Sequence, residues 1–535
     1  MLAEPGRRRL DRLVLAVLLA LVAGWGGLLL ARSSFVLAGT RYFCLFDDAM
    51  ISMAYAANAA AGDGLVWTPG SEPVEGFTNP LWTAAMVPLH WLPLDRATAS
   101  AAVQALGLLL VLATVGMARR LLLRHHHHGR PGPGAWLPAG VLIGSCYFFV
   151  YWSVMGMETP LQALLVLAAL YLAYEVVYSG KPRTLALFAV LAAAYLVRMD
   201  MALLIVLVLA WTAFRGGFRR GERRDWLLGA ALLVAAVAGY EVFRLLYFGD
   251  WLPNTYHLKV ASVPAAVRVP RGLHVLGVFA REHWLLLAAL AAAAVAGWRR
   301  RDDRVLLSAA VVAAYLAYSA WVGGDAWELP GEGFRSNRFV AFALPVAFVA
   351  VNDLLHRATR NLAPAARALV LAAATLLLVV QVNGLAATAN AAANRRLVLH
   401  RDRPPLVGSH AQVLHELLRF QERVRPGARV VTYWAGIPAY FADYRLFDAY
   451  GYNDRAAARR PLDPAVGWRA YRPGHKPPDV AALLDRRPDA FFQLWDLGRL
   501  PVRRPRHHLR ARGYVPVRGF WMRADSPYVE LPAAR

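Results

Sequence analysis

The chain has 535 residues, of which 58% are hydrophobic and only 18% are charged. That composition leaves too little polar surface for a soluble protein of this length. The formal net charge of +24 would suggest nucleic-acid binding in a soluble protein. Here much of the Arg lies in short clusters between long apolar runs, and no nucleic-acid motif is present. The sequence therefore predicts a multi-span helical membrane protein whose Arg clusters set its orientation.

The first apolar run, Leu13–Leu30, follows the basic cluster Arg7–Arg9. It is longer than a signal-peptide core and no clear small-residue cleavage site follows closely, so we expect a retained anchor with a cytoplasmic N-terminus. The next apolar piece, Pro80–Leu94, is too short to span and predicts an interfacial helix on the outer face. The first outer loop then covers residues 32–96. The following span, Ala97–Met117, delivers a set of arginines to the cytoplasm, as the positive-inside rule requires.

Alternating apolar runs and basic loops predict about nine more spans, roughly eleven in all. They are Ala135–Trp152, Pro160–Tyr178, Thr184–Val197, Met201–Phe214, Trp226–Phe248, His283–Trp298, Val305–Val322, Arg338–Leu355 and Ala366–Ala386. Residues 1–386 are therefore interpreted as an all-α polytopic membrane domain. The segment Gly249–Arg281 is expected to be an outer loop.

Residues 387–535 have shorter apolar runs and more Pro and Arg, which predicts a small external α/β domain. The segment His410–Val424 has helical periodicity. Four segments read as strands: Ala428–Tyr433, Asp489–Trp495, Val515–Arg523 and Tyr528–Leu531.

Cysteine and histidine usage gives little sign of a metal or disulfide framework. Cys44 and Cys146 lie far apart in apolar surroundings, and no CxxC motif exists. The run His125–His128 lies in an Arg-rich loop, so a solvated loop is favoured over a metal site.

Polar residues gather at the outer ends of the predicted spans. The first outer loop contributes Asp47, Asp48, Glu75 and Asn79, and later outer loops contribute Glu158, Arg198, Asp200, Asn254, Tyr256, His257, Lys259, Asp325, Trp327, Arg335 and Arg338. Aspartates beside hydrocarbon are costly, so the pair Asp47-Asp48 marks a candidate site. Acids, bases and aromatics from five loops are typical of an active site at the ends of a helical scaffold.

This set suits glycosyl transfer from a lipid-linked donor. Asp48 or Asp47 would act as general base, because adjacent carboxylates with apolar flanks raise one another's pKa. Four cations would hold the donor phosphate and its developing charge: Arg198, Lys259, Arg335 and Arg338. The remaining polar and aromatic residues would bind substrate. They are Glu75, Asn79, Glu158, Asp200, Asn254, Tyr256, His257, Asp325 and Trp327.

Each assignment has a structural alternative. The Asp pair could cap a helix that begins near Met50. Arg198 and Asp200 could form an ion pair between two short helices. Arg335 and Arg338 could anchor at lipid headgroups, and single aromatics could belong to an interfacial belt.

Several ordered motifs resemble the C-type (GT-C) membrane glycosyltransferases. The first outer loop carries the most specific ones, Phe46–Asn58, Gly62–Trp67 and Glu75–Trp82; Gly156–Pro160, Arg198–Asp200, Gly249–Tyr256 and Gly323–Asp325 follow in the same order. The likeness covers roughly residues 10–390 and is nearest to the mycobacterial terminal arabinofuranosyltransferase group. The insertion Pro330–Gly333, after Gly-Gly-Asp, departs from that pattern and leaves the sugar and the acceptor open.

The resemblance implies an inverting transfer of a sugar, arabinofuranose by nearest likeness, from a polyprenyl-phosphate donor to a cell-envelope glycan or glycolipid. The reaction would lie on the outer face of the cytoplasmic membrane, with Asp47 or Asp48 as base and the external domain helping to bind the acceptor. No cofactor is expected, although Asp47, Asp48 and Asp325 could converge on a divalent cation. The alternatives are a transporter or flippase of lipid-linked sugars, and a non-catalytic envelope scaffold.

Overall fold

The computed structural model describes residues 4–126, 132–179, 183–216, 223–328, 337–386, 390–492 and 505–532. The chain divides into two compact units. The helical unit consists of Met1–Arg32, Gln104–Tyr240 and Gly272–Pro404. The mixed unit consists of Ser33–Val103, Glu241–Arg271 and Pro405–Arg535. The mixed unit therefore combines the first predicted outer loop, a middle segment and the C-terminal region.

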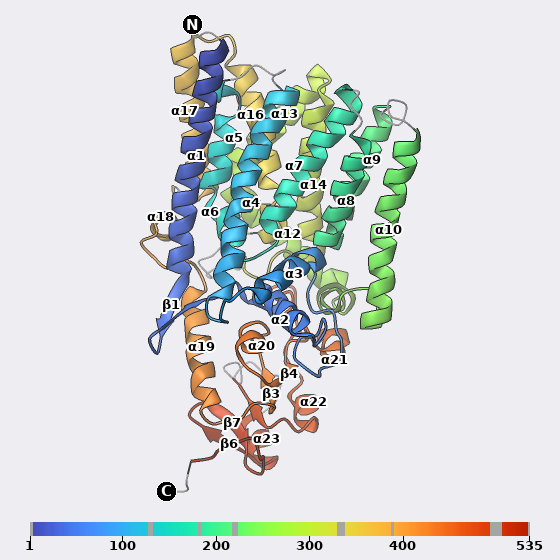
Figure 1. Ribbon diagram of the computed structural model, residues 1–535, viewed down its shortest axis with the longest axis vertical. Coiled ribbons are helices and arrows are strands. Elements are labelled where there is room, and N and C mark those ends of the chain that lie inside the picture. The colour runs from blue at the N-terminus through green and yellow to red at the C-terminus, as the bar shows by residue number, and fades with distance from the viewer. Residues whose placement is uncertain are drawn as a thin grey trace. The chain divides into compact units, whose positions relative to one another are not determined.

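The helical unit is built from segments rich in Ala, Leu and Val. These segments form helices because a helix pairs every backbone N–H and carbonyl group within the segment. Figure 1 shows these helices side by side, and α7 packs on α8 while α16 packs on α5, α13 and α14. The α-helices with residues in this unit are α1 (Glu4–Ser33), α4 (Ala99–Leu121), α5 (Leu137–Ser145), α6 (Tyr147–Val154), α7 (Thr159–Tyr174), α8 (Thr184–Val197), α9 (Ala202–Phe214), α10 (Arg223–Phe248), α12 (Ala265–Glu282), α13 (Trp284–Arg300), α14 (Asp303–Val322), α15 (Arg338–Ala341), α16 (Leu344–Ala358), α17 (Pro364–Val382) and α18 (Ala391–Val398). Short 3-10 or π turns are η2 (Leu122–His126), η3 (Pro133–Ala135), η4 (Glu175–Ser179) and η5 (Met199–Met201).

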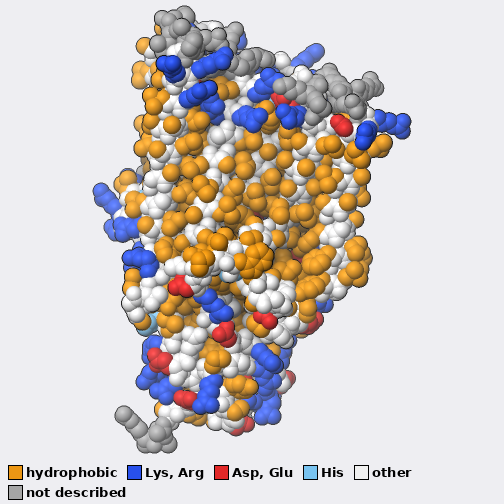
Figure 2. Space-filling model, in the orientation of Figure 1, with side chains coloured by type: hydrophobic (Ala, Val, Ile, Leu, Met, Phe, Trp, Pro, Cys, Tyr) orange, Lys and Arg blue, Asp and Glu red, His pale blue; other side chains and the backbone are white. Residues whose placement is uncertain are grey.

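Within the described residues, 6 helices are long and apolar enough to cross a membrane, and 8 spans result if each of two bent pairs counts as one. The bent pairs are α5 with α6, at 56°, and α12 with α13, at 89°. Figure 2 shows a broad hydrophobic belt over the helical unit, with Lys and Arg side chains gathered at its upper end. The chain is a multi-pass membrane protein.

The predicted spans are helical, but they differ in length and continuity. The expected spans at 184–197 and 201–214 are the short helices α8 and α9, of 14 and 13 residues. The expectation of an outer loop at 249–281 is wrong in part, because Ala265–Glu282 forms helix α12. Four arginines or histidines and Pro270 interrupt the apolar pattern there, which hid the helix from hydropathy.

The break between α5 and α6 is closed by one side chain from another part of the helical unit. Asn383 Oδ1 accepts a hydrogen bond from the Tyr147 N–H at 2.8 Å, and its Nδ2 donates to the Ser145 carbonyl at 3.0 Å. Asn383 is 1% exposed. An asparagine amide can replace the helix hydrogen bonds lost at the bend, because it carries both a donor and an acceptor.

Replacing Asn383 with Ala should therefore destabilise the helical unit, because a buried N–H and a carbonyl at the break lose their partner. We expect a loss of about 1–3 kcal/mol for each group left unsatisfied. Thermal unfolding in detergent measures it. Asn361→Ala, at an exposed residue of the same unit, is the control. Equal unfolding temperatures for the two variants would show that Asn383 does not support the bend.

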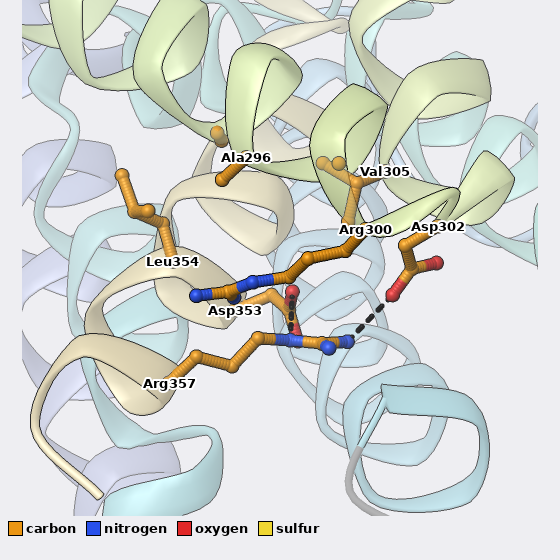
Figure 3. Close-up of a pocket in the computed structure, with 9 residues that line it drawn as sticks. Ala296, Arg300, Asp302, Val305, Asp353, Leu354 and Arg357 are labelled. Carbon is orange, nitrogen blue, oxygen red and sulfur yellow. Dashed lines mark hydrogen bonds and ion pairs between the residues drawn. The ribbon is translucent and has the colours of Figure 1, made fainter.

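Ion pairs join the ends of several helices in the helical unit. Arg357 binds Asp302 at 2.6 Å and Asp353 at 2.7 Å, as Figure 3 shows in a small pocket that Arg300 also lines. Arg124 binds Glu175 at 2.8 Å. Basic residues that the sequence analysis assigns to the cytoplasmic side thus neutralise acids at helix ends.

The mixed unit contains a five-stranded sheet of order β4-β3-β5-β7-β6. The strands are β3 (Arg429–Thr432), β4 (Arg445–Asp448), β5 (Ala490–Phe491), β6 (Tyr514–Val517) and β7 (Phe520–Arg523). Strand β3 is parallel to β4 and β5, and β7 is antiparallel to β5 and β6. The helices of this C-terminal part of the mixed unit are α19 (Val407–Gln421), α20 (Ile437–Phe441), α21 (Arg455–Arg459), α22 (Val480–Asp485) and α23 (Pro505–Ala511).

The first outer loop supplies the rest of the mixed unit. It contains the hairpin β1 (Ser34–Leu37) and β2 (Thr40–Phe43), then α2 (Asp47–Ala61), α3 (Pro80–Met86) and η1 (Val87–Trp91), and the middle segment adds α11 (Asn254–Tyr256) and η7 (His257–Ala261). The expected short helix at 80–94 is present as α3 and η1, both packed on α2.

The predicted α/β character of the C-terminal region is confirmed, with differences in its strands. Strand β4 was not predicted, and the segment 515–523 is a hairpin of β6 and β7 rather than one strand. The expected strand Tyr528–Leu531 is wrong: it forms only a single bridge, Val424 to Val529, because the segment turns at Ser526. The end of the segment Asp489–Trp495 lies outside the described residues.

Candidate functional site

The loops after β3 and β4 leave the sheet of the mixed unit at the same edge. The two strands are parallel and adjacent, and their register ends with Thr432 opposite Asp448. The carboxyl ends of parallel strands are where open α/β sheets place ligands, because successive loops open onto one edge there. Residues from the first outer loop and the middle segment meet these two loops.

Asp47 holds the loop that follows β3. Its carboxylate accepts hydrogen bonds from the backbone N–H groups of Ala435 at 3.2 Å, Gly436 at 3.1 Å and Ile437 at 3.0 Å. Ala435 is also held through its carbonyl, which accepts from Trp67 Nε1 at 2.8 Å. Burial raises the pKa of Asp47 to about 7, against the lowering effect of the three N–H donors.

The alternative that the Asp pair merely caps its own helix does not describe this arrangement. Helix α2 begins at Asp47 itself, and Phe46 occupies the N-cap position without a side-chain cap hydrogen bond. Both Asp47 and Asp48 lie in the first turn, where negative charge is favourable to the helix. Asp47 instead binds backbone donors at the start of α20.

Asp448 holds the loop that follows β4 in the same way. It is 1% exposed, and its carboxylate accepts from the N–H groups of Tyr450 at 3.0 Å, Gly451 at 3.0 Å and Asn453 at 2.9 Å. Burial raises the pKa of Asp448 to about 6. Two carboxylates, Asp448 buried and Asp47 partly buried, therefore fix two adjacent loops at one edge of the sheet.

His475 lies beside the loop after β4, against Tyr450, where the charges of Asp48 and Lys259 act on it. The negative charge of Asp48 and the positive charge of Lys259 both act on the pKa of His475. Burial is the larger effect and lowers that pKa to about 4, so the imidazole is neutral at physiological pH. The Lys259 Nζ lies 5.0 Å from the centre of the Tyr452 ring. The cluster thus offers a carboxylate, a cation and a neutral imidazole.

Several predicted substrate-binding residues of the mixed unit make framework contacts. The Glu75 carboxylate binds Arg244 at 2.6 Å, and both side chains are buried. Asn79 accepts from Ser52 at 2.9 Å and from Thr83 at 3.0 Å. These contacts tie the first outer loop to the end of α10 and join α2 to α3.

The middle segment is tied to the loop after β4. Asn254 Nδ2 donates to the carbonyls of Gly451 and Tyr452, both at 2.9 Å. His257 Nε2 lies 3.1 Å from Asp250, which also binds Arg459. Tyr256 is 39% exposed. Their predicted role in substrate binding stays a prediction.

The helical unit holds a second group of predicted site residues. Arg198 binds Glu158 at 2.8 Å and Asp200 at 2.7 Å, so the ion pair expected as an alternative is present. The Arg198 and Arg338 guanidiniums lie 5.8 and 5.5 Å from the Phe339 ring centre. The phenylalanine ring therefore lies near both cations, in reach of cation–π attraction.

Residues around the Gly-Gly-Asp motif lie in the same helical unit. Asp325 is fully buried, its carboxylate lies 3.4 Å from Arg338 Nε, and it also accepts from the Arg338 N–H at 3.4 Å. Trp327 is partly buried. Arg335 and the insertion at 330–333 lie outside the described residues.

Sequence reasoning missed the loop residues from the C-terminal region. Tyr433, Tyr450, Tyr452 and His475 lie at the candidate site, and the sequence analysis assigned them no role. The available signal was the segment Asp448–Asp454, in which two acids flank two tyrosines around a glycine.

Among the described residues, no group of three or more His, Cys, Asp or Glu side chains lies close enough to hold a metal ion. His125 is buried and its Nε2 lies 3.1 Å from Glu175; His127 and His128 lie outside the described residues. Cys44 and Cys146 are both buried free thiols.

The architecture is a GT-C fold: a polytopic helical membrane domain with a small sheet-containing region at the C-terminal end. It is similar to the crystal structure of ArnT from Cupriavidus metallidurans in the apo state, with a TM-score of 0.53, 15% identity, and 88% of this chain and 90% of that chain covered. The ArnT structure bound to undecaprenyl phosphate gives a TM-score of 0.53 and 14% identity, covering 83% and 86%. The fold class predicted from the sequence is confirmed.

Two further comparisons say little about function. The family model described as "Domain of unknown function (DUF8728)" matches residues 406–531, the sheet-containing part of the mixed unit. No curated protein matches the sequence.

The burial of Asp47 gives a pH-dependent stability. In the unfolded chain its pKa has the ordinary value of 3.8, and in the folded protein it is about 7. Between these values the folded state binds more protons, so the free energy of unfolding falls as pH rises through this window. Asp47→Asn should make the fall in unfolding temperature between about pH 4 and 7 less steep.

Asp448 keeps part of that pH dependence in the variant, because its own pKa is raised to about 6. Asp63→Asn, at an exposed aspartate of the same outer loop, should reproduce the wild-type profile. Superimposable profiles for wild type and Asp47→Asn would contradict the buried-carboxylate assignment.

Proposed function

We propose that this protein transfers a sugar from a polyprenyl-phosphate donor to a saccharide acceptor, with Asp48 as the general base. The observation that carries the proposal is that the Asp47 carboxylate is bound to three backbone N–H groups, whereas the charge of the neighbouring Asp48 acts on His475, which lies beside Tyr450 in the loop after β4. The likeness of the fold to ArnT, one structure of which contains undecaprenyl phosphate, supports it.

In the proposed reaction the acceptor hydroxyl attacks the anomeric carbon of the donor sugar. The bond between that carbon and the phosphate oxygen breaks, the hydroxyl proton passes to Asp48, and polyprenyl phosphate leaves with the bonding electrons. Attack from the face opposite the phosphate inverts the anomeric centre. A positioned carboxylate of this kind contributes roughly 10²–10⁴ in rate.

Lys259 is the proposed partner of the donor phosphate in the mixed unit. An ammonium group stabilises the charge that develops on the leaving phosphate. Arg198, Arg335 and Arg338 are retained as further candidate phosphate-binding residues. Fixed cations can perform this function, so the proposed chemistry includes no metal.

The finer proposals follow the sequence resemblance. They are an arabinofuranose donor, a cell-envelope glycan or glycolipid acceptor, and a site on the outer face of the cytoplasmic membrane, with the N-terminus in the cytoplasm.

The transporter alternative predicts charged residues inside discontinuous helices. Two bent helix pairs are present, which is the observation in its favour. The bend between α5 and α6 is closed by Asn383, and residues 137–154 contain no charged side chain. The other pair does carry arginines in α12, but the likeness of the fold to ArnT, one structure of which contains undecaprenyl phosphate, favours the enzyme. The enzyme proposal is therefore preferred.

Single-turnover assays with a panel of polyprenyl-phosphate sugars in detergent test the proposal. The wild type should transfer at least one sugar, and Asp48→Asn should lower the rate by about 10²–10⁴. Asp63→Asn is the matched control and should keep the wild-type rate. Absence of transfer from every donor, or full activity of Asp48→Asn, would refute the proposed function.

Lys259→Met should weaken binding of the donor more than it changes the fold, because the apolar stem is retained while the charge is lost. We expect at least a tenfold increase in the Kd for undecaprenyl phosphate, about 1.4 kcal/mol. Lys259→Arg keeps the charge and should lose less. An unchanged Kd in Lys259→Met would exclude Lys259 from the phosphate site.

A further inference from the structure

A row of aromatic side chains follows the carboxyl edge of the sheet in the mixed unit. The Tyr433 ring, after β3, lies 5.4 Å from the Tyr450 ring, after β4. The Tyr450 ring lies 5.0 Å from that of His475, which in turn lies 6.4 Å from that of Tyr452. Adjacent rings meet at steep angles of 82°, 60° and 83°, so they do not stack face on face. We call these four residues the aromatic row.

Three members of the aromatic row remain partly accessible. Tyr433, Tyr450 and His475 are partly exposed, whereas Tyr452 is buried, with 7% of its surface exposed. The row carries polar groups as well as ring faces, since three members are phenols and one is an imidazole. Lys259 lies at its Tyr452 end, with its Nζ 5.0 Å from that ring centre.

The backbone beneath the aromatic row is fixed by buried polar contacts. Asp448 binds three N–H groups between Tyr450 and Asn453, and Asn453 Nδ2 donates to the same carboxylate at 3.0 Å. Asn254 binds the carbonyls of Gly451 and Tyr452. A surface held in place before binding loses little conformational entropy when a ligand arrives.

Gly474 packs so closely against the aromatic row that it leaves no room for a side chain. Its φ is +79°, and a Cβ there would come 2.2 Å from the Tyr452 hydroxyl and 3.0 Å from Lys259 Cε. The segment before His475 thus packs directly against Tyr452 and Lys259, which places the cation beside the aromatic row.

The chemistry of the aromatic row fits a saccharide. Sugar rings present apolar C–H faces together with a rim of hydroxyls, and Tyr and His offer an apolar ring with a polar edge. A prenyl chain would instead be matched by an unbroken aliphatic surface. Asp47, the neighbour of Asp48, binds the backbone N–H groups that begin two residues after Tyr433. The Tyr433 end of the row is therefore close to the proposed base, where an acceptor hydroxyl has to arrive.

We propose that the aromatic row of Tyr433, Tyr450, Tyr452 and His475 binds the acceptor saccharide and directs its hydroxyl toward Asp48. This inference rests on the proposed function for the identity of the ligand as acceptor. It assigns to the C-terminal region a part of the substrate site itself.

The test compares Tyr450→Ala with Tyr450→Phe in the full-length protein. Tyr450→Ala removes the ring and should raise the KM for the acceptor at least tenfold, while the Kd for undecaprenyl phosphate stays unchanged. Tyr450→Phe retains the ring and should raise the KM for the acceptor less than Tyr450→Ala does. Tyr433→Ala provides a second site on the row, and Tyr528→Ala, at an exposed tyrosine of the same unit, is the control.

Binding of labelled arabino-, galacto-, manno- and gluco-oligosaccharides, followed by saturation-transfer NMR, gives a readout that does not need turnover. Wild type should bind at least one of them, and Tyr450→Ala and Tyr433→Ala should lose that signal at an unchanged unfolding temperature. If the wild type binds a saccharide through the row but transfers no sugar, the proposed function fails and the aromatic row stands as a saccharide site. If Tyr450→Ala leaves the acceptor KM and the NMR signal unchanged, or weakens undecaprenyl phosphate instead, the inference is overturned.

Discussion

Two carboxylates with little or partial exposure hold the loops at one edge of the sheet in the mixed unit. Asp47 and Asp448 each accept hydrogen bonds from three backbone N–H groups, in the loops that follow the parallel neighbours β3 and β4. A buried carboxylate is costly unless it is hydrogen-bonded, and each of these oxygens is bound to main chain rather than to a cation. The side chains that reach the sheet edge are therefore placed by main-chain contacts.

The two aspartates of the first outer loop have different surroundings although they are adjacent in sequence. The Asp47 carboxylate accepts a hydrogen bond at the start of α20, whereas the charge of Asp48 acts on the pKa of His475. A pair of acids in apolar surroundings gives by itself no reason to prefer either as a base, and this difference is why we propose Asp48. The reason for this choice is that the Asp47 carboxylate is already bound to the loop after β3.

Hydropathy and charge predicted much of the helical unit, because a span needs a long apolar run and the loops carry arginine. They failed where polar residues interrupt a helix, as at Pro270 and its neighbouring arginines in α12. They also failed for β4, Arg445–Asp448, whose four residues include two charges. The Asp pair was found from its cost beside hydrocarbon, whereas its hydrogen-bond partners lie 388 to 390 residues away in sequence. Contacts at that separation have no local pattern, so the tyrosines after β3 and β4 were missed.

We assign separate functions to the two adjacent aspartates, and one comparison of variants tests that assignment most directly. Asp47→Asn and Asp48→Asn are measured together for unfolding temperature and for single-turnover sugar transfer. The account predicts that Asp48→Asn keeps the wild-type unfolding temperature and loses about 10²–10⁴ in rate, whereas Asp47→Asn changes the pH dependence of unfolding. Full transfer activity in Asp48→Asn, with the loss of rate in a normally folded Asp47→Asn, would contradict it.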